Sequence, residues 1–433
     1  MPDLKILALS ASATSGLSAG ELEKVAKESI GAIMDTLTKG KPEAQSAKAE
    51  PPKKPRPAGV LSFTGKNYTE AVESMEKYFL ANRWSDGLPL VPATPEAVEA
   101  MLKGTDLARD QVVGIVDPRK GVATVEKIAI NAVLAGARPA YFPLILAAVQ
   151  ALVDPAFDLY GVQCTGGLAA PLFIVSGPIV KDLNINFSYS TAGPGFRANS
   201  TIGRTMRLIL INLGQAWPGI NDMKDFGNPA KFGILVAENE AQTPPGWATL
   251  REREGFNKGV STVSVYASQS YRQFPKHTIK PYIEQETVDQ LKTSLLATAG
   301  QWGEEIVLAI SPSTAEIMAK NNYTPASIQK ELYERGRVPR KDFGPRPLGG
   351  LGVSSGIPKW IDDLPDDGLV PVVPRPEDIK IFVAGGKGPG AGVVIDRWGF
   401  GLSRFVTKEI KLPPNWKDQL KDLAPWETPI EVK

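Results

Sequence analysis

Cysteine and histidine are almost absent from this sequence of 433 residues, which contains one of each, Cys164 and His277. A single cysteine cannot form a disulfide within the chain, so nothing in the sequence indicates an oxidising compartment. One cysteine and one histidine cannot supply four ligands, which excludes a Cys/His zinc site within one chain. A site in which carboxylate, carbonyl or ligand oxygens hold a metal stays possible. The spacing of residues in the sequence does not identify metal ligands or a cofactor.

A strong net charge and long hydrophobic runs are also lacking. Lysine and arginine number 49 against 47 acidic residues, a net charge of +2, so no global field attracts nucleic acid or an anionic membrane. The apolar run ILAAVQALV, between Pro143 and Asp154, is shorter than the roughly 20 residues that cross a bilayer. Asp3 stands where a signal peptide would carry basic residues. We therefore expect a cytoplasmic protein without nucleic-acid or membrane partners.

The apolar residues that are present predict an α/β fold. They make up 42% of the chain, a typical share for a globular protein, and they recur with strand and helix periods. We expect mixed sheets with buried helices in a two-lobed body. The predicted parts are an N-terminal β-α arm at residues 1–38, a Pro- and Lys-rich linker at 39–59, a main α/β domain at 60–285, and a second α/β subdomain with a C-terminal tail at 286–433.

Several local patterns give more detailed expectations within the body. Two nearly all-apolar segments, residues 123–136 and 143–153, predict helices in the interior. Residues 162–178 predict a strand, a loop of small residues and a second strand. The strings WSDGLPLVP at 84–92 and DDGLVPVVP at 366–374 form a weak pseudo-repeat.

The segment TAGPGFRANSTIGR, residues 191–204, is the most informative candidate for a ligand site. A glycine-bordered loop directly ahead of a helix aims unpaired backbone N–H groups at one point, and arginines there can hold a carboxylate or phosphate. The alternative is plain helix capping by Asn199 or Ser200, with solvated arginines. The segment has neither a Walker loop nor a dinucleotide fingerprint. Its candidate ligand-binding residues are Gly193, Gly195, Arg197, Asn199, Ser200, Thr201 and Arg204.

Polar residues also interrupt the apolar segment at 123–136. Glu126, Lys127 and Asn131 need partners, water or a ligand, because burying them unpaired is costly. Glu126 and Lys127 would suit a general acid and base in a cleft, with Asn131 as a ligand-binding residue. In the alternative interpretation, Glu126 stabilises the helix dipole and Lys127 extends to solvent.

Glu238 and Glu240 follow a predicted strand, a common position for site residues in α/β sheets. With Asp222 and Asp225, which are near in sequence, they could bind a hard cation or act as acid and base. The spacing matches no specific metal motif, and an exposed strand end is the alternative.

Cys164 lies in a loop of small residues, where a thiol could act as a nucleophile. No histidine is near in sequence to help it ionise, so a buried structural cysteine is the alternative. We expect His277 to be a surface or packing residue. No GxSxG elbow is present for a serine hydrolase.

The strings WSDGLPLVPAT, VATVEKIAINAVLAGARP, GPGFRANSTIGR and VAENE together resemble an uncharacterised bacterial family, whose genes lie beside a small cysteine or selenocysteine protein with a UGSC motif. The resemblance covers residues 60–270 and, more weakly, IFVAGG in the tail. It implies a two-component system in which this chain binds a small molecule and a thiol or selenol partner supplies nucleophilic or redox chemistry. Asp86, in the first string, is included among the candidate ligand-binding residues. The sequence lacks the family's histidines near Cys164 and after the tail's glycine loop, which argues against a histidine-based mechanism.

Two functional hypotheses follow. In the first, the chain is a subunit of a bacterial enzyme, a lyase, hydrolase or reductase component, that acts on a small anionic molecule bearing a carboxylate or phosphate. A separate thiol, selenol or redox subunit completes that enzyme. In the second, the chain is a non-catalytic binding or assembly subunit of a larger complex. Both hypotheses predict a homo- or hetero-oligomer.

Overall fold

The computed structural model describes residues 59–275, 285–297, 302–342, 358–388, 390–399 and 402–423, together with Lys24, Lys27 and Ile30. The chain divides into two units, Met1–Lys54 and Pro55–Lys433, and the elements described below belong to the second. Apart from those three helical residues, the predicted arm and almost all of the predicted linker lie outside the described residues, as does His277.

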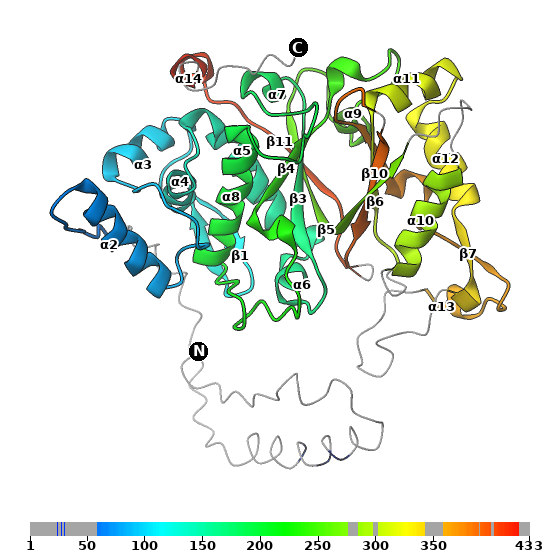
Figure 1. The fold of residues 1–433 in the computed structure, drawn as a ribbon, viewed down its shortest axis with the longest axis horizontal. Helices are drawn as coiled ribbons and strands as arrows, with labels where there is room; N and C mark the ends of the chain where they lie inside the picture. The colour runs from blue at the N-terminus through cyan, green and yellow to red at the C-terminus, as the bar shows by residue number, and fades with distance from the viewer. Residues whose placement is uncertain are drawn as a thin grey trace, which may run out of the picture. The chain divides into compact units, whose positions relative to one another are not determined.

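A mixed sheet of seven strands forms the centre of the second unit (Figure 1). Its path runs through β4 (Ile234–Ala237), β3 (Ala170–Ser176), β5 (Thr262–Pro275), β10 (Gly390–Arg397), β6 (Ile306–Ile310) and β9 (Ile379–Val383), and β11 (Val406–Glu409) pairs with β5. The β3–β4 and β6–β9 pairs are parallel and the other pairs are antiparallel. The predicted mixed α/β fold is confirmed.

The two halves of this sheet follow the same plan. In each half a parallel pair of strands is followed in sequence by an antiparallel strand: β3, β4 and β5 in the first half, and β6, β9 and β10 in the second. The long strands β5 and β10 pair antiparallel in the middle, so an approximate two-fold axis relates the halves. The strings at 84–92 and 366–374 do not mark this repeat, because only the second contains a strand, β8 (Leu369–Pro371).

The sheet curls until its two edge strands meet. Asn239, two residues beyond β4, donates its backbone N–H to the carbonyl of Val383, the last residue of β9, at 2.7 Å. Alternate residues of the strands pack together on the inner face, because successive side chains of a strand point to opposite faces. The main members of this inner core are Leu172, Ile174, Val236, Tyr266, Val307, Phe382 and Ile395.

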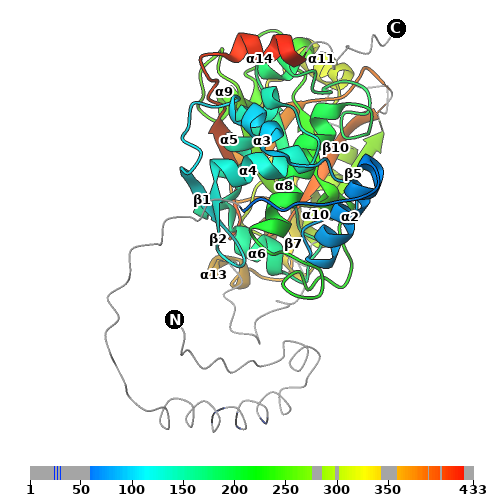
Figure 2. The ribbon, with the colours of Figure 1, turned by 90° about the vertical axis from the view of Figure 1, so that its left-hand side faces the viewer.

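The outer faces of the strands are covered by two helical layers (Figures 1 and 2). The first layer contains α3 (Pro95–Leu102), α4 (Val125–Leu134), α5 (Phe142–Leu152) and α8 (Arg197–Asn212), and the second contains α10 (Gln285–Ala297), α11 (Pro312–Lys320) and α12 (Pro325–Arg335). Every residue of α5 except Gln150 is buried, as its apolar sequence predicts. No single helix among the described residues is long and apolar enough to cross a membrane; one bent pair, Pro139–Leu152 with Pro155–Cys164, passes by length and composition alone.

The remaining helices and strands complete the unit. They are α2 (Tyr68–Ala81), β1 (Val112–Val116), β2 (Gly121–Thr124), α6 (Leu159–Cys164), α7 (Ile179–Asp182), α9 (Leu250–Arg253), β7 (Arg337–Pro339), α13 (Lys359–Asp362) and α14 (Trp416–Leu423). Residues on both sides of the expected boundary at 285/286 share the sheet, and Trp398, Val406 and Trp416 from the C-terminal part pack into the first outer core.

One predicted strand is wrong. Residues 162–164 belong to the short helix α6, whose N-cap Asp158 accepts a hydrogen bond from the Gly161 N–H at 3.2 Å. The period of a short apolar run is the same in a buried strand and a buried helix, so the run alone does not predict which one forms. Here the capping residue favours a helix.

Two glycines bring α8 into direct backbone contact with the start of β4. A Cβ atom added to Gly203 on α8 would lie 2.9 Å from the carbonyl carbon of Gly233. Gly233 has φ +104°, in the region that favours glycine, and a Cβ there would lie 2.2 Å from the carbonyl carbon of Gly203. Glycine at both positions lets the helix approach the strand without a gap.

We therefore predict that Gly203→Ala lowers the free energy of unfolding by about 1–3 kcal/mol, because the methyl group must push α8 away from the backbone of Gly233. Urea denaturation followed by circular dichroism measures the change. Gly227→Ala is the matched control: an added Cβ at Gly227 meets nothing within 4 Å, so its effect should stay within about 0.5 kcal/mol. Equal effects of the two substitutions would contradict the close contact.

Candidate functional site

A pocket of about 430 Å³ lies at the carboxyl ends of β3 and β4. Ligands of α/β proteins commonly bind at this position, since loops and helix ends gather beyond the strand ends. The pocket is lined by Gly177, Pro178, Val180, Lys181, Asp182, Phe187, Glu238, Glu240 and Ala241. Of the residues predicted from the sequence to carry chemistry, Glu238 and Glu240 lie in this pocket.

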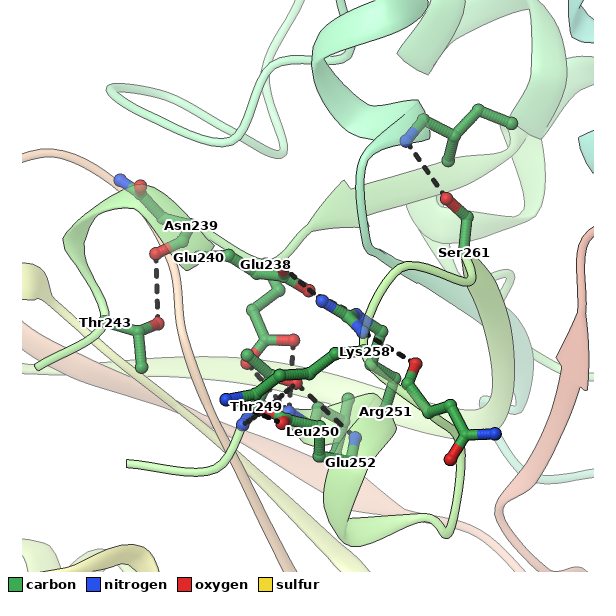
Figure 3. Close-up of polar contacts among 12 residues, drawn as sticks. Glu238, Asn239, Glu240, Thr243, Thr249, Leu250, Arg251, Glu252, Lys258 and Ser261 are labelled. Atoms are coloured by element: carbon green, nitrogen blue, oxygen red, sulfur yellow. Dashed lines mark hydrogen bonds and ion pairs between the residues drawn. The ribbon is translucent and has the colours of Figure 1, made fainter. Parts of the chain in front are cut away.

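Glu238 is a buried carboxyl group in the pocket wall (Figure 3). Only 2% of the residue is exposed, and its two oxygens accept the Leu250 N–H at 2.9 and 3.1 Å. A hydrogen bond with the Ser176 side chain adds a second partner. Among the described residues, no lysine or arginine lies within ion-pair distance of this carboxyl group.

Burial raises the pKa of Glu238 to about 7. The lost solvation of the charged form outweighs the hydrogen bonds from Leu250 and Ser176, which favour that form. A carboxyl group with a pKa near neutrality can both donate and accept a proton at physiological pH. Glu238 therefore has the protonation equilibrium that a general acid or base needs.

Glu240 lies in the same pocket in a different electrostatic state. Its carboxylate forms a two-pronged ion pair with Arg251: Nε lies 2.8 Å from Oε1 and Nη2 lies 2.9 Å from Oε2 (Figure 3). Arg251 also donates to the carbonyl of Asn257 at 3.0 Å, so the guanidinium is held in place. The ion pair compensates the charge of Glu240, whereas Glu238 has no ion-pair partner among the described residues.

Asn239 lies between these two glutamates and connects the halves of the sheet. Besides the backbone bond to Val383, its side-chain amide donates to the Gly385 carbonyl at 3.2 Å. Its own carbonyl accepts the Thr243 hydroxyl at 3.1 Å (Figure 3). With Asn239 fixed in this way, the neighbouring carboxyl groups keep a defined position in the pocket.

Three further residues that line the pocket were not predicted from the sequence. Lys181 and Asp182 belong to α7, and Phe187 lies in the loop that follows. Burial raises the pKa of Asp182, and a hydrogen bond with the Trp416 side chain opposes this shift. The available signal was the buried strand β3, which ends at Ser176 and is followed at once by Gly177 and Pro178, because small residues at the end of a buried strand mark an α/β loop.

The loop predicted to bind an anion is arranged for structural roles. Asn199 is buried; its Oδ1 accepts the Asn186 N–H at 2.7 Å, and its Nδ2 donates to the Leu235 carbonyl at 3.1 Å. The Thr201 hydroxyl donates to the carbonyl of Arg197 within the helix. The bond from Asn199 to Leu235 ties the start of α8 to β4. The remaining candidates, Gly193, Gly195, Arg197 and Ser200, are exposed or half-buried and do not line the pocket.

Arg204 holds a carboxylate of the chain itself. Its Nε and Nη2 donate to the two oxygens of Asp86 at 2.7 and 2.9 Å, and Nη2 also reaches the Leu88 carbonyl at 3.0 Å. The prediction that Arg204 supplies free positive charge to a ligand does not fit this geometry. Asp86, a second candidate, is the internal partner that neutralises it.

Glu126, Lys127 and Asn131 lie on α4, away from the pocket. Glu126 forms an ion pair with Arg109, and Lys127 donates to the Val122 carbonyl at 3.2 Å. Asn131 is buried, and its Oδ1 accepts from Asn212 at 2.7 Å. All three have internal partners, and Lys127 bonds to the backbone where the structural alternative expected it to extend to solvent.

Cys164 and Asp222 lie at the opposite ends of the strands, near the start of β3 and β4. Burial raises the pKa of the half-buried Cys164 thiol, and the nearby Lys224 charge opposes this only in part. The Asp222 carboxylate is paired with lysines, and Asp225 is exposed. No group of three or more His, Cys, Asp or Glu side chains in the described part of the chain is placed to hold a metal ion.

A comparison with models of known protein families finds no match for this chain, and a search of curated proteins finds no similar sequence. The geometry of the pocket is therefore the basis for assigning a function.

We predict that Glu238 makes the stability of the protein depend on pH. Because the folded protein holds this proton more tightly than the unfolded chain, the free energy of unfolding falls as the pH rises from about 4.5 to about 7, and then levels off. At about 1.4 kcal/mol per pKa unit the total loss is about 3 kcal/mol. Glu238→Gln removes this component, so its unfolding free energy should fall less than that of the wild type.

Urea denaturation of both proteins at intervals between pH 4.5 and 8.5 measures the difference. Glu73→Gln is the control, since Glu73 is exposed on α2 and its removal should leave the pH profile of the wild type unchanged. Superimposable profiles for the wild type and Glu238→Gln would show that Glu238 titrates normally.

Proposed function

We propose that this chain is the substrate-binding subunit of an enzyme that acts on a small polar molecule in the pocket beyond β3 and β4, with Glu238 as the proton donor or acceptor. The observation that carries the proposal is a buried carboxyl group, without an ion-pair partner among the described residues, in the wall of a 430 Å³ pocket. General acid–base catalysis by a positioned group typically contributes 10²–10⁴-fold to a rate.

The charges around the pocket are compatible with the anionic substrate expected from the sequence. Glu240 is neutralised by Arg251, and burial raises the pKa of Glu238 to about 7, which favours its uncharged form more than in an ordinary glutamate. Lys181 is a cation among the lining residues and is suited to a substrate carboxylate or phosphate. Asp182 beside it disfavours a second negative group in the substrate.

The properties of Cys164 support the proposed thiol or selenol partner. A nucleophilic or redox thiol needs a lowered pKa, whereas burial raises the pKa of Cys164. The residue is also the last of α6, ahead of β3, and does not line the pocket. Thiol chemistry at the pocket would therefore come from another chain, which agrees with the two-component system that the family resemblance implies.

A thermal-shift screen of small carboxylic acids, phosphate esters and amides tests the proposed pocket. We expect the compounds that raise the melting temperature of the wild type to lose this effect in Ala241→Trp, because the indole fills the pocket from its exposed rim. Ala108→Trp, at another exposed alanine, is the control and should respond as the wild type does. If every stabilising compound acts equally on both variants, the pocket is not the binding site.

Residues 60–91 give specific support to the second function, an assembly subunit. This segment presents a concentration of exposed apolar side chains, and large exposed apolar patches mark protein–protein contacts. Its exposed apolar residues are Val60, Leu61, Tyr68, Tyr78, Leu80, Trp84, Leu88 and Val91. The two functions are compatible, since a catalytic subunit can also assemble through this surface.

We predict that the double variant Tyr68→Glu/Leu80→Glu lowers the mass of the purified assembly, because it introduces charges into the exposed apolar surface. Light scattering after size-exclusion chromatography measures the mass. Both side chains are more than half exposed, so the substitutions should leave the fold intact. Leu412→Glu, at an exposed leucine elsewhere, is the control. A monomeric wild-type protein would exclude self-association through this surface.

A further inference from the structure

A second group of charged side chains lies where β3 and β4 begin, at the ends remote from the pocket. Lys231 is in the 3-10 turn Pro229–Phe232 directly before β4, and Arg207 is on α8. Helix α6, which precedes β3, lies at the opposite end of that strand from α7 (Figure 1). We call Arg207, Lys224, Lys231 and Asp222 the Arg207 cluster.

Hydrogen bonds hold this cluster together. Asp222 lies between two lysines: its Oδ1 is 3.2 Å from the Lys224 Nζ, and its Oδ2 contacts the Lys231 Nζ. The Lys224 ammonium also donates to the carbonyls of Val162 and Gln163 at 3.2 and 3.1 Å. The Arg207 guanidinium donates to the Lys231 carbonyl and, at 3.4 Å, to the Gln163 side chain.

The cluster buries three cations with one carboxylate. The side chains of Lys224, Asp222 and Lys231 are 1%, 6% and 15% exposed, and Arg207 is also buried. Arg207 has no carboxylate within ion-pair distance among the described residues. Buried charges require compensation by opposite charge, and one carboxylate leaves an excess of two positive charges.

Neighbouring carboxylates do not remove this excess. Asp86, whose field reaches Arg207, is already bound by Arg204. The Asp158 carboxylate caps α6 by accepting the Gly161 N–H at 3.2 Å, and among the described residues it forms no ion pair with a cation of the cluster. Burial also lowers the pKa of Lys231 to about 8 and that of Arg207 to about 10, as expected for cations that lack sufficient counter-charge.

Exposed apolar side chains lie beside the lysines in the sequence. Met223 precedes Lys224, and Phe232 follows Lys231; both are 59% exposed. Phe226, in the same connection between α8 and β4, is 78% exposed. A site that combines buried cations with exposed apolar side chains suits a ligand with an anionic end and an apolar body.

We propose that the Arg207 cluster binds an oxyanion, the carboxylate or phosphate group of a ligand whose apolar part contacts Met223, Phe226 and Phe232. The oxyanion supplies the negative charge that Asp222 alone does not provide. This site is separate from the Glu238 pocket, because it lies at the amino ends of β3 and β4, whereas the pocket lies at their carboxyl ends.

Thermal shift of the full chain at constant ionic strength, with phenyl phosphate, benzoate and sodium chloride, tests the proposal. We expect phenyl phosphate or benzoate to raise the melting temperature above the chloride control, and the more effective compound identifies the type of oxyanion. Titration calorimetry with that compound should give an affinity at least about tenfold lower for Lys231→Met than for the wild type. Lys320→Met removes an exposed lysine and should retain the wild-type affinity.

Two further variants keep the test decisive. Asp222→Asn removes the internal competitor, so it should melt at a lower temperature without ligand and bind the oxyanion more tightly than the wild type. Ala241→Trp, which fills the Glu238 pocket, should bind the oxyanion unchanged. The proposal is overturned if neither compound raises the melting temperature above the chloride control, or if Lys231→Met binds the oxyanion as tightly as Lys320→Met does. It is also overturned if Asp222→Asn does not bind the oxyanion more tightly than the wild type, or if Ala241→Trp abolishes binding.

Discussion

The contact between the ends of β4 and β9 is the constraint on which the rest of the structure depends. A curled sheet encloses an inner core only if its edges meet, and the bond from Asn239 to Val383 joins them. The same residue separates Glu238 from Glu240. Closing the sheet therefore fixes the backbone that carries both carboxyl groups. Glu238 is buried without an ion-pair partner among the described residues, and Glu240 is paired with Arg251.

The two halves of the sheet share an approximate two-fold plan but differ in the residues that follow their edge strands, β4 and β9. Beyond β4 the chain continues with Glu238, Asn239 and Glu240, whereas beyond β9 it continues with Ala384, Gly385 and Gly386. A Cβ atom on Gly386 would lie 2.4 Å from the ring of Tyr189, so this end is packed by a side chain from the loop ahead of α8. The two halves share a backbone plan, but the acidic strand end belongs to the first half.

Helix α8 shows how neighbouring arginines acquire different roles. Arg204 is neutralised by Asp86, a residue 118 positions away, and so stabilises the fold. Arg207, one turn further along, is buried beside two lysines that share a single carboxylate. The difference arises from the tertiary surroundings of each guanidinium.

Much of the architecture was predictable from the sequence because it depends on local patterns. The apolar content of 142–152 required a buried helix, strand and helix periods indicated a mixed α/β fold, and an acidic pair after a buried strand pointed to Glu238. The tertiary structure alone decided which charges remain free. The ion pair between Arg204 and Asp86 joins residues that are distant in sequence, and the burial that raises the pKa of Glu238 also depends on distant segments. The local period of apolar residues does not show which side chains the folded chain brings together.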